Sequence, residues 1–312
     1  MAQIENHSER KKPGIFPLLV DKWIARYARP SASALDAVAH LKPVVVVTGG
    51  SRGIGLALAR RFAKAGHDVA ILARNSGALQ EAAATIEHDF NVKAHAITTD
   101  ITDPDAPRRL DEQLAKRGCY LDILINSAGI GLSGRFESHD EKEVAHLLNL
   151  NVMALTRLMH YALPDMLARG RGGILNVASL GGLAAGPYQA AYYASKAYVI
   201  SLTEAVAWEN AGEGVRLTVL APGPVDTSFH EAMGAESSFY RLLLPPLSPE
   251  RTANSAYSGY VLGRCLVVPG VTNTLMAIAL RILPHTLLLP LVGWLLRPRG
   301  DFSDQATNDG ER

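Results

Sequence analysis

Four consecutive valines at positions 44–47 lead directly into a glycine-rich segment at 48–55, which reads Thr-Gly-Gly-Ser-Arg-Gly-Ile-Gly. A fully apolar, β-branched run is typical of a strand buried on both faces of a sheet, and residues 56–65 have a helical pattern. The glycines let a pyrophosphate approach the backbone, and the amino terminus of the next helix favours its negative charge. This junction predicts an α/β fold of the Rossmann type, a doubly wound parallel sheet with helices on both faces and a dinucleotide site.

The expected second strand, residues 68–73, bears on the choice of dinucleotide. It ends where an acidic residue would bind the adenosine ribose of NAD, but that position holds Ala73, followed by Arg74 and Asn75. No carboxylate there repels a 2′-phosphate, and Arg74 can hold one through bidentate hydrogen bonds. Arg52 in the glycine turn offers a second cation. The alternative is that both arginines are simply solvent-exposed and bind nothing. The absence of the acidic residue and the presence of two arginines together predict NADP(H) rather than NAD(H).

Helical and strand-like patterns alternate as far as residue 268 and predict one domain at 43–270. Asp100 and Ile101 follow one strand, where they can flank an adenine ring. Asn126, Ala128 and Gly129 follow another, and small residues there let the backbone lie against a bound cofactor. We expect strands at 93–98, 121–125, 173–178, 215–220 and 265–268, and helices at 76–90, 103–116 and 140–160.

A hydroxyl, a phenol and an ammonium occur at spacings that allow them to converge. Ser179 follows an apolar run, so we expect it at the carboxyl end of a buried strand, where open α/β sheets place their sites. Tyr192 and Lys196 are one turn apart on a predicted helix and share a face. A neighbouring cation lowers the pKa of a phenol from about 10 toward neutrality, which suits proton transfer. Taken alone, such a pair is also common on ordinary helix surfaces.

Together these motifs resemble those of the classical short-chain dehydrogenases/reductases, over about residues 43–270. The family's Thr-Gly-x-x-x-Gly-x-Gly turn is matched at 48–55, and its Asn-Asn-Ala-Gly segment at 126–129, with Ser127 in place of the second Asn. The Tyr-x-x-x-Lys motif falls on Tyr192 and Lys196.

The interval between serine and tyrosine supports the same resemblance. Ser179 lies thirteen residues before Tyr192, which is the interval that the family shows. Tyr188 and Tyr193 lack the four-residue spacing to Lys196 and are not the expected tyrosine.

The resemblance implies a catalytic set of Asn151, Ser179, Tyr192 and Lys196. In carbonyl reduction, a hydride would pass from the nicotinamide to the carbonyl carbon while Tyr192 gives a proton to the developing alkoxide. Ser179 would stabilise charge on the oxygen. Lys196 would bind the nicotinamide ribose and lower the pKa of Tyr192, and Asn151 would hold a water of a proton relay. No metal is implied.

Residues 222–227 resemble the family's segment that holds the nicotinamide carboxamide. With the patterns above, this completes the set of residues expected to contact NADP(H): Thr48, Gly49, Ser51, Arg52, Gly53, Ile54, Gly55, Arg74, Asn75, Asp100, Ile101, Asn126, Ala128, Gly129, Tyr192, Lys196, Pro222, Gly223, Val225 and Thr227.

The substrate is expected to be lipophilic. Residues 227–249 are rich in apolar and aromatic side chains, and the resemblance implies that this region covers the substrate. We therefore expect an oxidoreductase acting on a carbonyl or secondary alcohol of a steroid, retinoid or fatty-acyl type. The same residues could instead simply pack on the sheet. A different class of function, a noncatalytic regulator or scaffold that binds NADPH, is the alternative.

Both ends of the chain extend beyond the expected domain. Residues 1–42 form an N-terminal extension in which 1–13 are expected to be disordered, and 15–24 to be an amphipathic segment on the core, on a partner or on a membrane surface. Residues 271–299 are apolar, but prolines interrupt the run and it is shorter than the ~20 residues of a spanning helix. Residues 281–299 suit either peripheral membrane contact or a flap packed on the lid or on a second subunit, which we favour. Residues 300–312 are expected to be disordered.

Charge and cysteine content exclude other classes. A formal net charge of +1 gives no electrostatic case for a nucleic-acid partner. Two cysteines are too few for a disulfide framework or a metal cluster, so a reducing, cytoplasmic location is expected. The resemblance further implies a homodimer or homotetramer.

Overall fold

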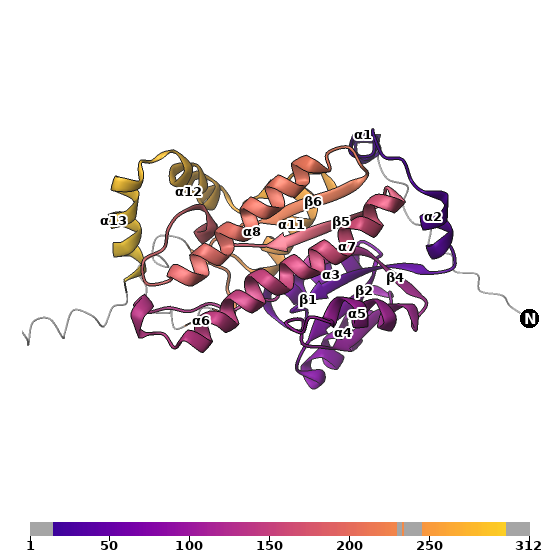
Figure 1. Ribbon diagram of the computed structural model, residues 1–312, viewed down its shortest axis with the longest axis horizontal. Coiled ribbons are helices and arrows are strands. Elements are labelled where there is room, and N and C mark those ends of the chain that lie inside the picture. The colour runs from indigo at the N-terminus through magenta and orange to yellow at the C-terminus, as the bar shows by residue number, and fades with distance from the viewer. Residues whose placement is uncertain (1–14, 230–232, 234–244, 298–312) are drawn as a thin grey trace, which may run out of the picture.

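One parallel sheet organises the molecule, as the computed structural model shows for residues 15–229, 233 and 245–297 (Figure 1). Its seven strands follow the order β3-β2-β1-β4-β5-β6-β7. The strands are β1 (Lys42–Thr48), β2 (Asp68–Ala73), β3 (Ala94–Thr98), β4 (Cys119–Asn126), β5 (Gly172–Val177), β6 (Val215–Leu220) and β7 (Leu266–Val267). The order reverses between β1 and β4, and crevices for ligands form at such a switch point.

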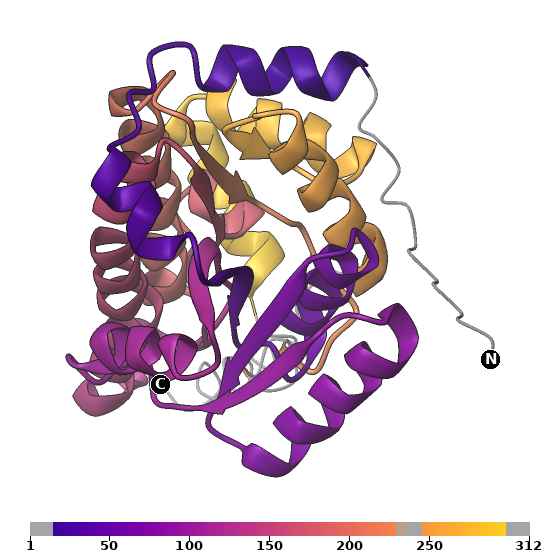
Figure 2. The same cartoon turned by 90° about the vertical axis from the view of Figure 1, so that its right-hand side faces the viewer.

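Helices cover both faces of the sheet (Figures 1 and 2). One face carries α3 (Gly53–Lys64), α4 (Ser76–Phe90) and α11 (Pro249–Val261), and the other carries α5 (Ala106–Ala115), α7 (Leu155–Arg169) and α8 (Ala190–Glu209). The valines of β1 divide between the two cores: Val45 and Val47 pack with α3, and Val44 and Val46 pack with α5 and α7. The predicted doubly wound sheet is confirmed.

A hydroxyl ties the two strands at the switch point together. Thr48 ends β1, and its Oγ1 accepts hydrogen bonds from the backbone N–H groups of Ser127 (3.0 Å) and Ala128 (3.1 Å), directly after β4. Asn126 lies opposite Thr48 in register and donates to Asn176 Oδ1 of β5 at 2.9 Å. The carboxyl ends of three neighbouring strands are thereby held at one level.

The helix expected at 140–160 is longer and less regular than predicted. It begins as α6 (Glu141–Leu148), passes through a π-helical segment η2 (Asn149–Ala154), and continues as α7 to Arg169. Asp140 and Glu143 form a capping box at its start. Asn149 and Asn151, both mediocre helix formers, lie in this π-helical segment, and such segments often mark functional sites.

The N-terminal extension packs on the core of its own chain. It contains α1 (Ile15–Ile24) and α2 (Ala32–Val38). Ile24 is buried, and its carbonyl accepts a hydrogen bond of 3.0 Å from Gly214 N. Of the three alternatives for residues 15–24, the structure therefore shows contact with the core, at the end of the molecule away from α13 (Figure 1).

The C-terminal extension forms two helices, α12 (Val271–Ile282) and α13 (His285–Leu296). Pro290, expected to interrupt the apolar run, lies inside α13. Within the described ranges, every helix is too short or too polar to cross a membrane. The disorder expected at 1–13 and 300–312 concerns residues outside the described part of the chain, as does most of the expected lid, residues 230–232 and 234–244.

Candidate active site

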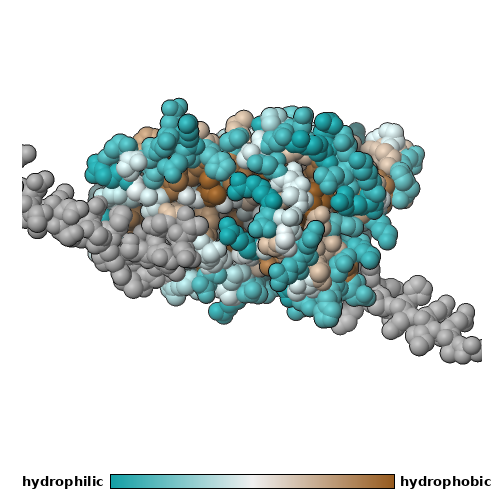
Figure 3. Space-filling model, turned by 90° about the horizontal axis from the view of Figure 1, so that it is seen from below, coloured by the Kyte–Doolittle hydropathy of each residue, from teal (hydrophilic) through white to brown (hydrophobic). Residues whose placement is uncertain are grey.

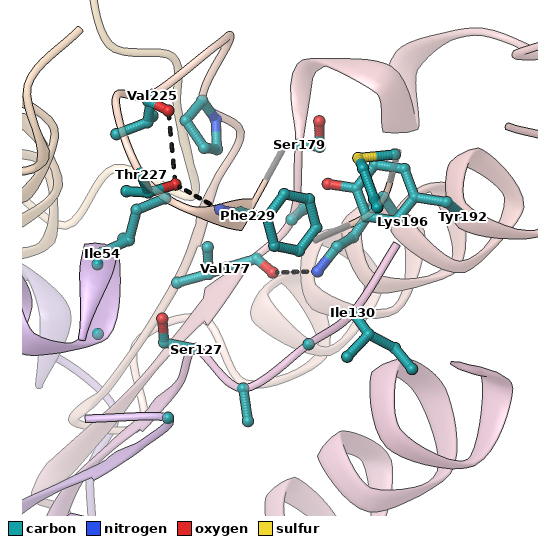
Figure 4. A pocket seen from close by; sticks show the side chains of 18 of the residues that line it. Ile54, Ser127, Ile130, Val177, Ser179, Tyr192, Lys196, Val225, Thr227 and Phe229 are labelled. Carbon is teal, nitrogen blue, oxygen red and sulfur yellow. Dashed lines mark hydrogen bonds between the residues drawn. The ribbon is translucent and has the colours of Figure 1, made fainter. Parts of the chain in front are cut away.

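A cavity of about 670 Å³ opens at the carboxyl edge of the sheet. One part of its wall is the glycine turn after β1, and another is the start of α8 (Figure 4). The predicted site residues that line it are Gly49, Ser51, Arg52, Gly53, Ile54, Gly55, Arg74, Asn75, Asp100, Ile101, Ala128, Gly129, Ser179, Tyr192, Lys196, Pro222, Gly223, Val225 and Thr227. Segments from most of the chain therefore converge on one hollow.

The glycine turn is packed too closely for side chains at two of its positions. Gly49 has a left-handed backbone (φ 66°), and a Cβ there would lie 2.9 Å from Ala128 Cα. A Cβ on Gly55 would lie 2.2 Å from the carbonyl oxygen of Gly49. The turn thus presents bare backbone and the first N–H groups of α3 to the cavity, which suits a pyrophosphate.

Two exposed arginines flank the adenosine end of the cavity. Arg52 immediately precedes α3, and Arg74 follows β2. Asn75 caps α4 by accepting a hydrogen bond from Ala78 N (3.3 Å). Among the described lining residues, Asp100 is the only carboxylate, and hydrogen bonds from Thr102, aided by the Arg74 charge, lower its pKa. This donor set fits a 2′-phosphate better than an unmodified ribose.

Ser179 and Tyr192 meet at the opposite end of the cavity. Ser179 lies two residues after the end of β5 and caps the short helix η3 (Leu180–Leu183), where its Oγ accepts from Gly181 N at 3.1 Å. Its hydroxyl also hydrogen-bonds the phenol of Tyr192, in the first turn of α8. Figure 4 shows both side chains on the same side of the hollow. A substrate oxygen between them would meet two hydroxyl groups.

Lys196 lies one turn farther along α8 and is tied to the sheet. Its Nζ donates a hydrogen bond of 3.0 Å to the carbonyl of Val177 and lies 5.8 Å from the ring centre of Tyr192. A Cβ on Gly129 would come within 3.4 Å of this Nζ, so the loop after β4 also confines the lysine.

Burial dominates the pKa values of the pair. It raises the pKa of Tyr192 to about 12, against the hydrogen bond from Ser179, and it lowers the pKa of Lys196 to about 8. The expectation that Lys196 lowers the Tyr192 pKa is therefore wrong for this structure. The ammonium bonds a backbone carbonyl rather than the phenol, and exclusion of water disfavours charge on both groups.

Asn151 supports the site from behind. Its Oδ1 accepts from Ile130 N (2.9 Å), and its Nδ2 donates to Ile130 O (2.8 Å) and to Ser195 Oγ (3.2 Å). Ser195 in turn donates to the carbonyl of Tyr192 at 2.6 Å. Asn151 does not line the cavity, and neither do the predicted residues Thr48 and Asn126. These three side chains hold other parts of the wall in place.

The segment after β6, residues 222–229, is held by contacts with Leu247 and with α12. Val225 pairs with Leu247, and Thr227 Oγ1 accepts from Phe229 N at 3.4 Å. A Cβ on Gly223 would lie 2.3 Å from Oδ1 of the buried Asn273 in α12, so close packing there requires glycine. The C-terminal extension thus contacts the segment expected to hold the nicotinamide.

The sequence analysis favoured a flap at residues 281–299, packed on the lid or on a second subunit, but did not identify α12 and α13 as a wall of the cavity. Their lining residues are apolar: Met276, Leu280, Val292, Leu295 and Leu296. On α13, Leu288, Val292 and Leu296 are buried against Tyr188 and Tyr193. The structure therefore places this extension on the site of its own chain, as a flap. Figure 3 shows apolar residues (brown) among hydrophilic ones, several of them near the middle of this face.

The polar lining residues that were also missed include His146 of α6 and Gln189 before α8. Gln189 lies three residues before Tyr192, a spacing that could have drawn attention to it.

Comparisons with known proteins agree with this arrangement. The profile of the family described as short chain dehydrogenase matches residues 43–238. The ketoacyl reductase HetN of Nostoc sp. is 35% identical over 181 residues, which are 58% of this chain and 63%, less than two thirds, of HetN. The 3-oxoacyl-[acyl-carrier-protein] reductase FabG of Staphylococcus aureus is 31% identical over 65% of this chain and 82% of its own length. A short-chain dehydrogenase from Sphingobium yanoikuyae, solved with NADPH, is 29% identical, with a TM-score of 0.67 over 73% of this chain and 88% of that one.

Proposed function

The chain belongs to the short-chain dehydrogenase family of oxidoreductases, and from this we propose that it is an NADP(H)-dependent enzyme that interconverts a lipophilic ketone and its secondary alcohol. The observation that carries the proposal is the convergence of Ser179, Tyr192 and Lys196 on a cavity that also contains the glycine turn and Arg74. We assign the enzyme domain to residues 43–270, with 1–42 and 271–299 as extensions and 300–312 as a tail.

NADP(H) is the cofactor that the lining residues fit. Bare backbone at Gly49 and Gly55 suits the pyrophosphate, and Arg52 and Arg74 suit the 2′-phosphate. The solved relative bound to NADPH supports the same choice. When bound, the cofactor supplies or accepts the hydride, and the protein supplies position and protons.

Tyr192 is proposed as the proton donor in carbonyl reduction. Because burial raises its pKa to about 12, the phenol is protonated at neutral pH and can donate to an oxygen that is becoming an alkoxide. Ser179, already hydrogen-bonded to that phenol, would stabilise charge on the same oxygen. Reduction is the direction that this protonation state serves.

Lys196 and Asn151 are proposed to restore the proton. The Lys196 pKa of about 8 lies near neutral pH, so the ammonium can give up and regain a proton. Asn151 lies in a π turn, where the usual backbone hydrogen bonds are displaced and a carbonyl can bind a water. A water there would connect Lys196 to solvent.

The substrate part of the cavity is apolar, which supports a lipophilic substrate. Phe229 lies 5.7 Å from Tyr192, ring centre to ring centre, and Met233 is buried beside them. Leu280, Val292 and Leu296 close the hollow from the C-terminal extension. Such a wall suits an acyl chain or a fused-ring ketone of the steroid or retinoid kind.

Incubating the protein with NADPH and a panel of lipophilic ketones, while following the loss of NADPH absorbance, tests the proposal. Binding of NADPH without turnover of any ketone would contradict it.

Assembly as a homodimer or homotetramer is proposed from the exposed face of α7 and α8. Tyr161, Tyr198 and Trp208 are large side chains on this face, and Trp208 is 83% exposed. A second copy of the chain would cover them. Light scattering of the wild type and of Trp208→Glu would test this, since loss of assembly only in the variant is expected.

A reducing, cytoplasmic location is proposed because Cys119 and Cys265 are both free thiols.

Peripheral membrane contact would have to use residues 281–299, whose outward side chains include the exposed Leu287, Leu291 and Trp294. Flotation with liposomes, compared between the full chain and a chain lacking these residues, tests that contact. Equal behaviour of the two would exclude it.

A further inference from the structure

Gln189 stands out among the lining residues of the cavity because its side-chain amide has a buried donor that is not used. Its side chain is 4% exposed, and its Nε2 has no hydrogen-bond partner within the described part of the chain. It occupies the N-cap position of α8 without capping the helix through its side chain. A buried amide donor without a partner is unfavourable for folding, so such a group is expected to have a function.

Gln189 shares its cavity with the reacting groups. It lies at the start of the helix that carries Tyr192 and Lys196, three residues before the tyrosine, and lines the same cavity. The lining also includes apolar and aromatic residues of α8 and α12, among them Tyr193, Met276 and Leu280. A polar substrate atom near the reacting carbonyl would therefore find an unused hydrogen-bond donor there.

The backbone before Gln189 is fixed in an unusual conformation. Tyr188 has a left-handed backbone, φ 63°, which is costly for a residue with a bulky side chain. Two contacts hold it: Gly134 N donates to its carbonyl at 2.8 Å, and its side chain packs on the buried face of α13. A strained residue held from two sides gives its neighbour a defined orientation.

We propose that Gln189 is a substrate-recognition residue, whose side-chain amide donates a hydrogen bond to a second oxygen of the substrate. The preferred substrate is then a ketone with an ester or thioester carbonyl next to the reacting carbonyl, as in a 3-oxoacyl group, with its apolar tail along α12 and α13. This assignment rests on the proposed reductase function and narrows it, because a plain steroid or retinoid ketone lacks the second acceptor. A site built to bond such an oxygen discriminates against analogues that lack it.

A matched pair of ketones tests the assignment. Ethyl 3-oxodecanoate carries the second carbonyl, and 1-ethoxydecan-3-one has a methylene in its place, at equal chain length. An ester group makes the neighbouring ketone more reactive whatever enzyme reduces it, so kcat/KM for the keto ester alone is not informative. The quantity to compare between wild type and variant is the ratio of kcat/KM for the keto ester to kcat/KM for the ether ketone. Gln189→Met keeps the length of the side chain and removes the donor. We expect it to lower kcat/KM for the keto ester at least tenfold and to leave the ether ketone within twofold.

Gln189→Glu adds a readout that a merely structural role would not move. An ionised carboxylate cannot donate a hydrogen bond, whereas a protonated one can. In Gln189→Glu, the preference for the keto ester over the ether ketone should therefore be lost at neutral pH and partly regained on acidification. In the wild type, the ratio of the two kcat/KM values should not change with pH. Melting temperature and NADPH affinity measured for both variants establish that each is folded.

The outcomes separate two failures. If both ketones lose activity equally in Gln189→Met, or if neither does, the assignment of Gln189 is overturned and the reductase function stands. If the wild type reduces a steroid or retinoid ketone but neither of these two, the Gln189 assignment fails and the reductase function stands. If the wild type binds NADPH but reduces no ketone of either kind, the proposed reductase function fails, and the Gln189 assignment fails with it.

Discussion

The ammonium of Lys196 donates a hydrogen bond of 3.0 Å to the carbonyl oxygen of Val177, the last residue of β5. This contact fixes the first turns of α8 against the sheet edge from which the chain continues to Ser179. The lysine therefore has a structural position that is independent of the phenol beside it, and the two side chains can be tested separately.

Replacing Tyr192 by Phe should abolish most turnover, because only the proton-donating hydroxyl is removed. The expected loss in kcat is roughly 10²–10⁴-fold, with NADPH affinity within about twofold of wild type, as steady-state kinetics and fluorescence titration would measure. Tyr198→Phe is the matched control on the same helix, where the hydroxyl meets Thr156 instead. A Tyr192→Phe protein that retains turnover would favour the alternative of a scaffold or regulator, or another proton donor.

Replacing Arg74 by Ala should remove the preference for NADPH. The wild type is expected to bind NADPH at least about tenfold more tightly than NADH, equivalent to ~1.4 kcal/mol, because the guanidinium meets the 2′-phosphate. The variant should lose this margin through weaker NADPH binding, with NADH affinity unchanged, in fluorescence titrations. Arg117→Ala, at the opposite end of the strands, is the control. Equal or tighter binding of NADH by wild type would refute the 2′-phosphate site.

Lys196 should make the folded state more stable as pH rises above neutrality. Its folded pKa is about 8, against 10.5 for an unperturbed lysine, so between these values the unfolded chain binds more protons and the free energy of unfolding increases with pH. From about pH 8 to about pH 9.5 the gain should be roughly 2 kcal/mol. Urea denaturation of wild type and Lys196→Met at several pH values checks this. The raised pKa values of Cys265 and Tyr192 make the free energy of unfolding fall as pH rises, and because both proteins contain these groups, the difference between their free energies of unfolding reports the lysine alone. Parallel pH curves for the two proteins would contradict it.

A charged substitution on α13 should impair catalysis only on the side of the helix that lines the cavity. Val292 is 8% exposed and lines the cavity, whereas the adjacent Leu291 is 49% exposed. Val292→Asp would bury a carboxylate in an apolar wall, and we expect kcat/KM for a long-chain ketone to fall at least about tenfold while NADPH affinity persists. Leu291→Asp should remain close to wild type in the same assays. Equal kinetics of the two variants would mean that α13 does not form the substrate wall.

Asn151 should contribute to stability more than Asn149, although both lie in the π turn. The Asn151 side chain makes three hydrogen bonds, two with Ile130 and one with Ser195, and is 1% exposed, whereas Asn149 is exposed. Asn151→Ala leaves buried partners unpaired and should lower the free energy of unfolding by about 1–3 kcal/mol. Asn149→Ala should change it little in the same denaturation experiment. A similar loss in both would show that the π turn itself, not these bonds, is responsible.

The features that the sequence predicted are those encoded in short segments. The valines at 44–47 specify a strand buried on both faces because each one meets a helix layer, and the glycines at 48–55 specify a turn because a Cβ on Gly55 would collide with Gly49. The spacing of Tyr192 and Lys196 is likewise local. Such patterns need no knowledge of the remainder of the fold.

The features that escaped prediction depend on contacts between distant parts of the chain. Tyr188 packs against a buried cluster of α13 that lies about a hundred residues farther along the chain, so nothing near Gln189 in the sequence indicates that a C-terminal helix holds its neighbour. The direction of the Tyr192 pKa shift depends on how much water the surrounding side chains exclude, which spacing alone does not determine.

The wall formed by α12 and α13 has a consequence for how this enzyme can diversify. The parts of the cavity suited to the nucleotide come from segments between Gly49 and Thr227, while an apolar part of its wall comes from the last two helices described. Substitutions on Val292 or Leu296 can therefore reshape the space for a substrate without altering the turn at Gly49 or the arginine at position 74. Substrate preference should therefore be open to change through the lining residues of α13, whereas α12 is tied to the nucleotide side of the cavity because Asn273 packs on Gly223.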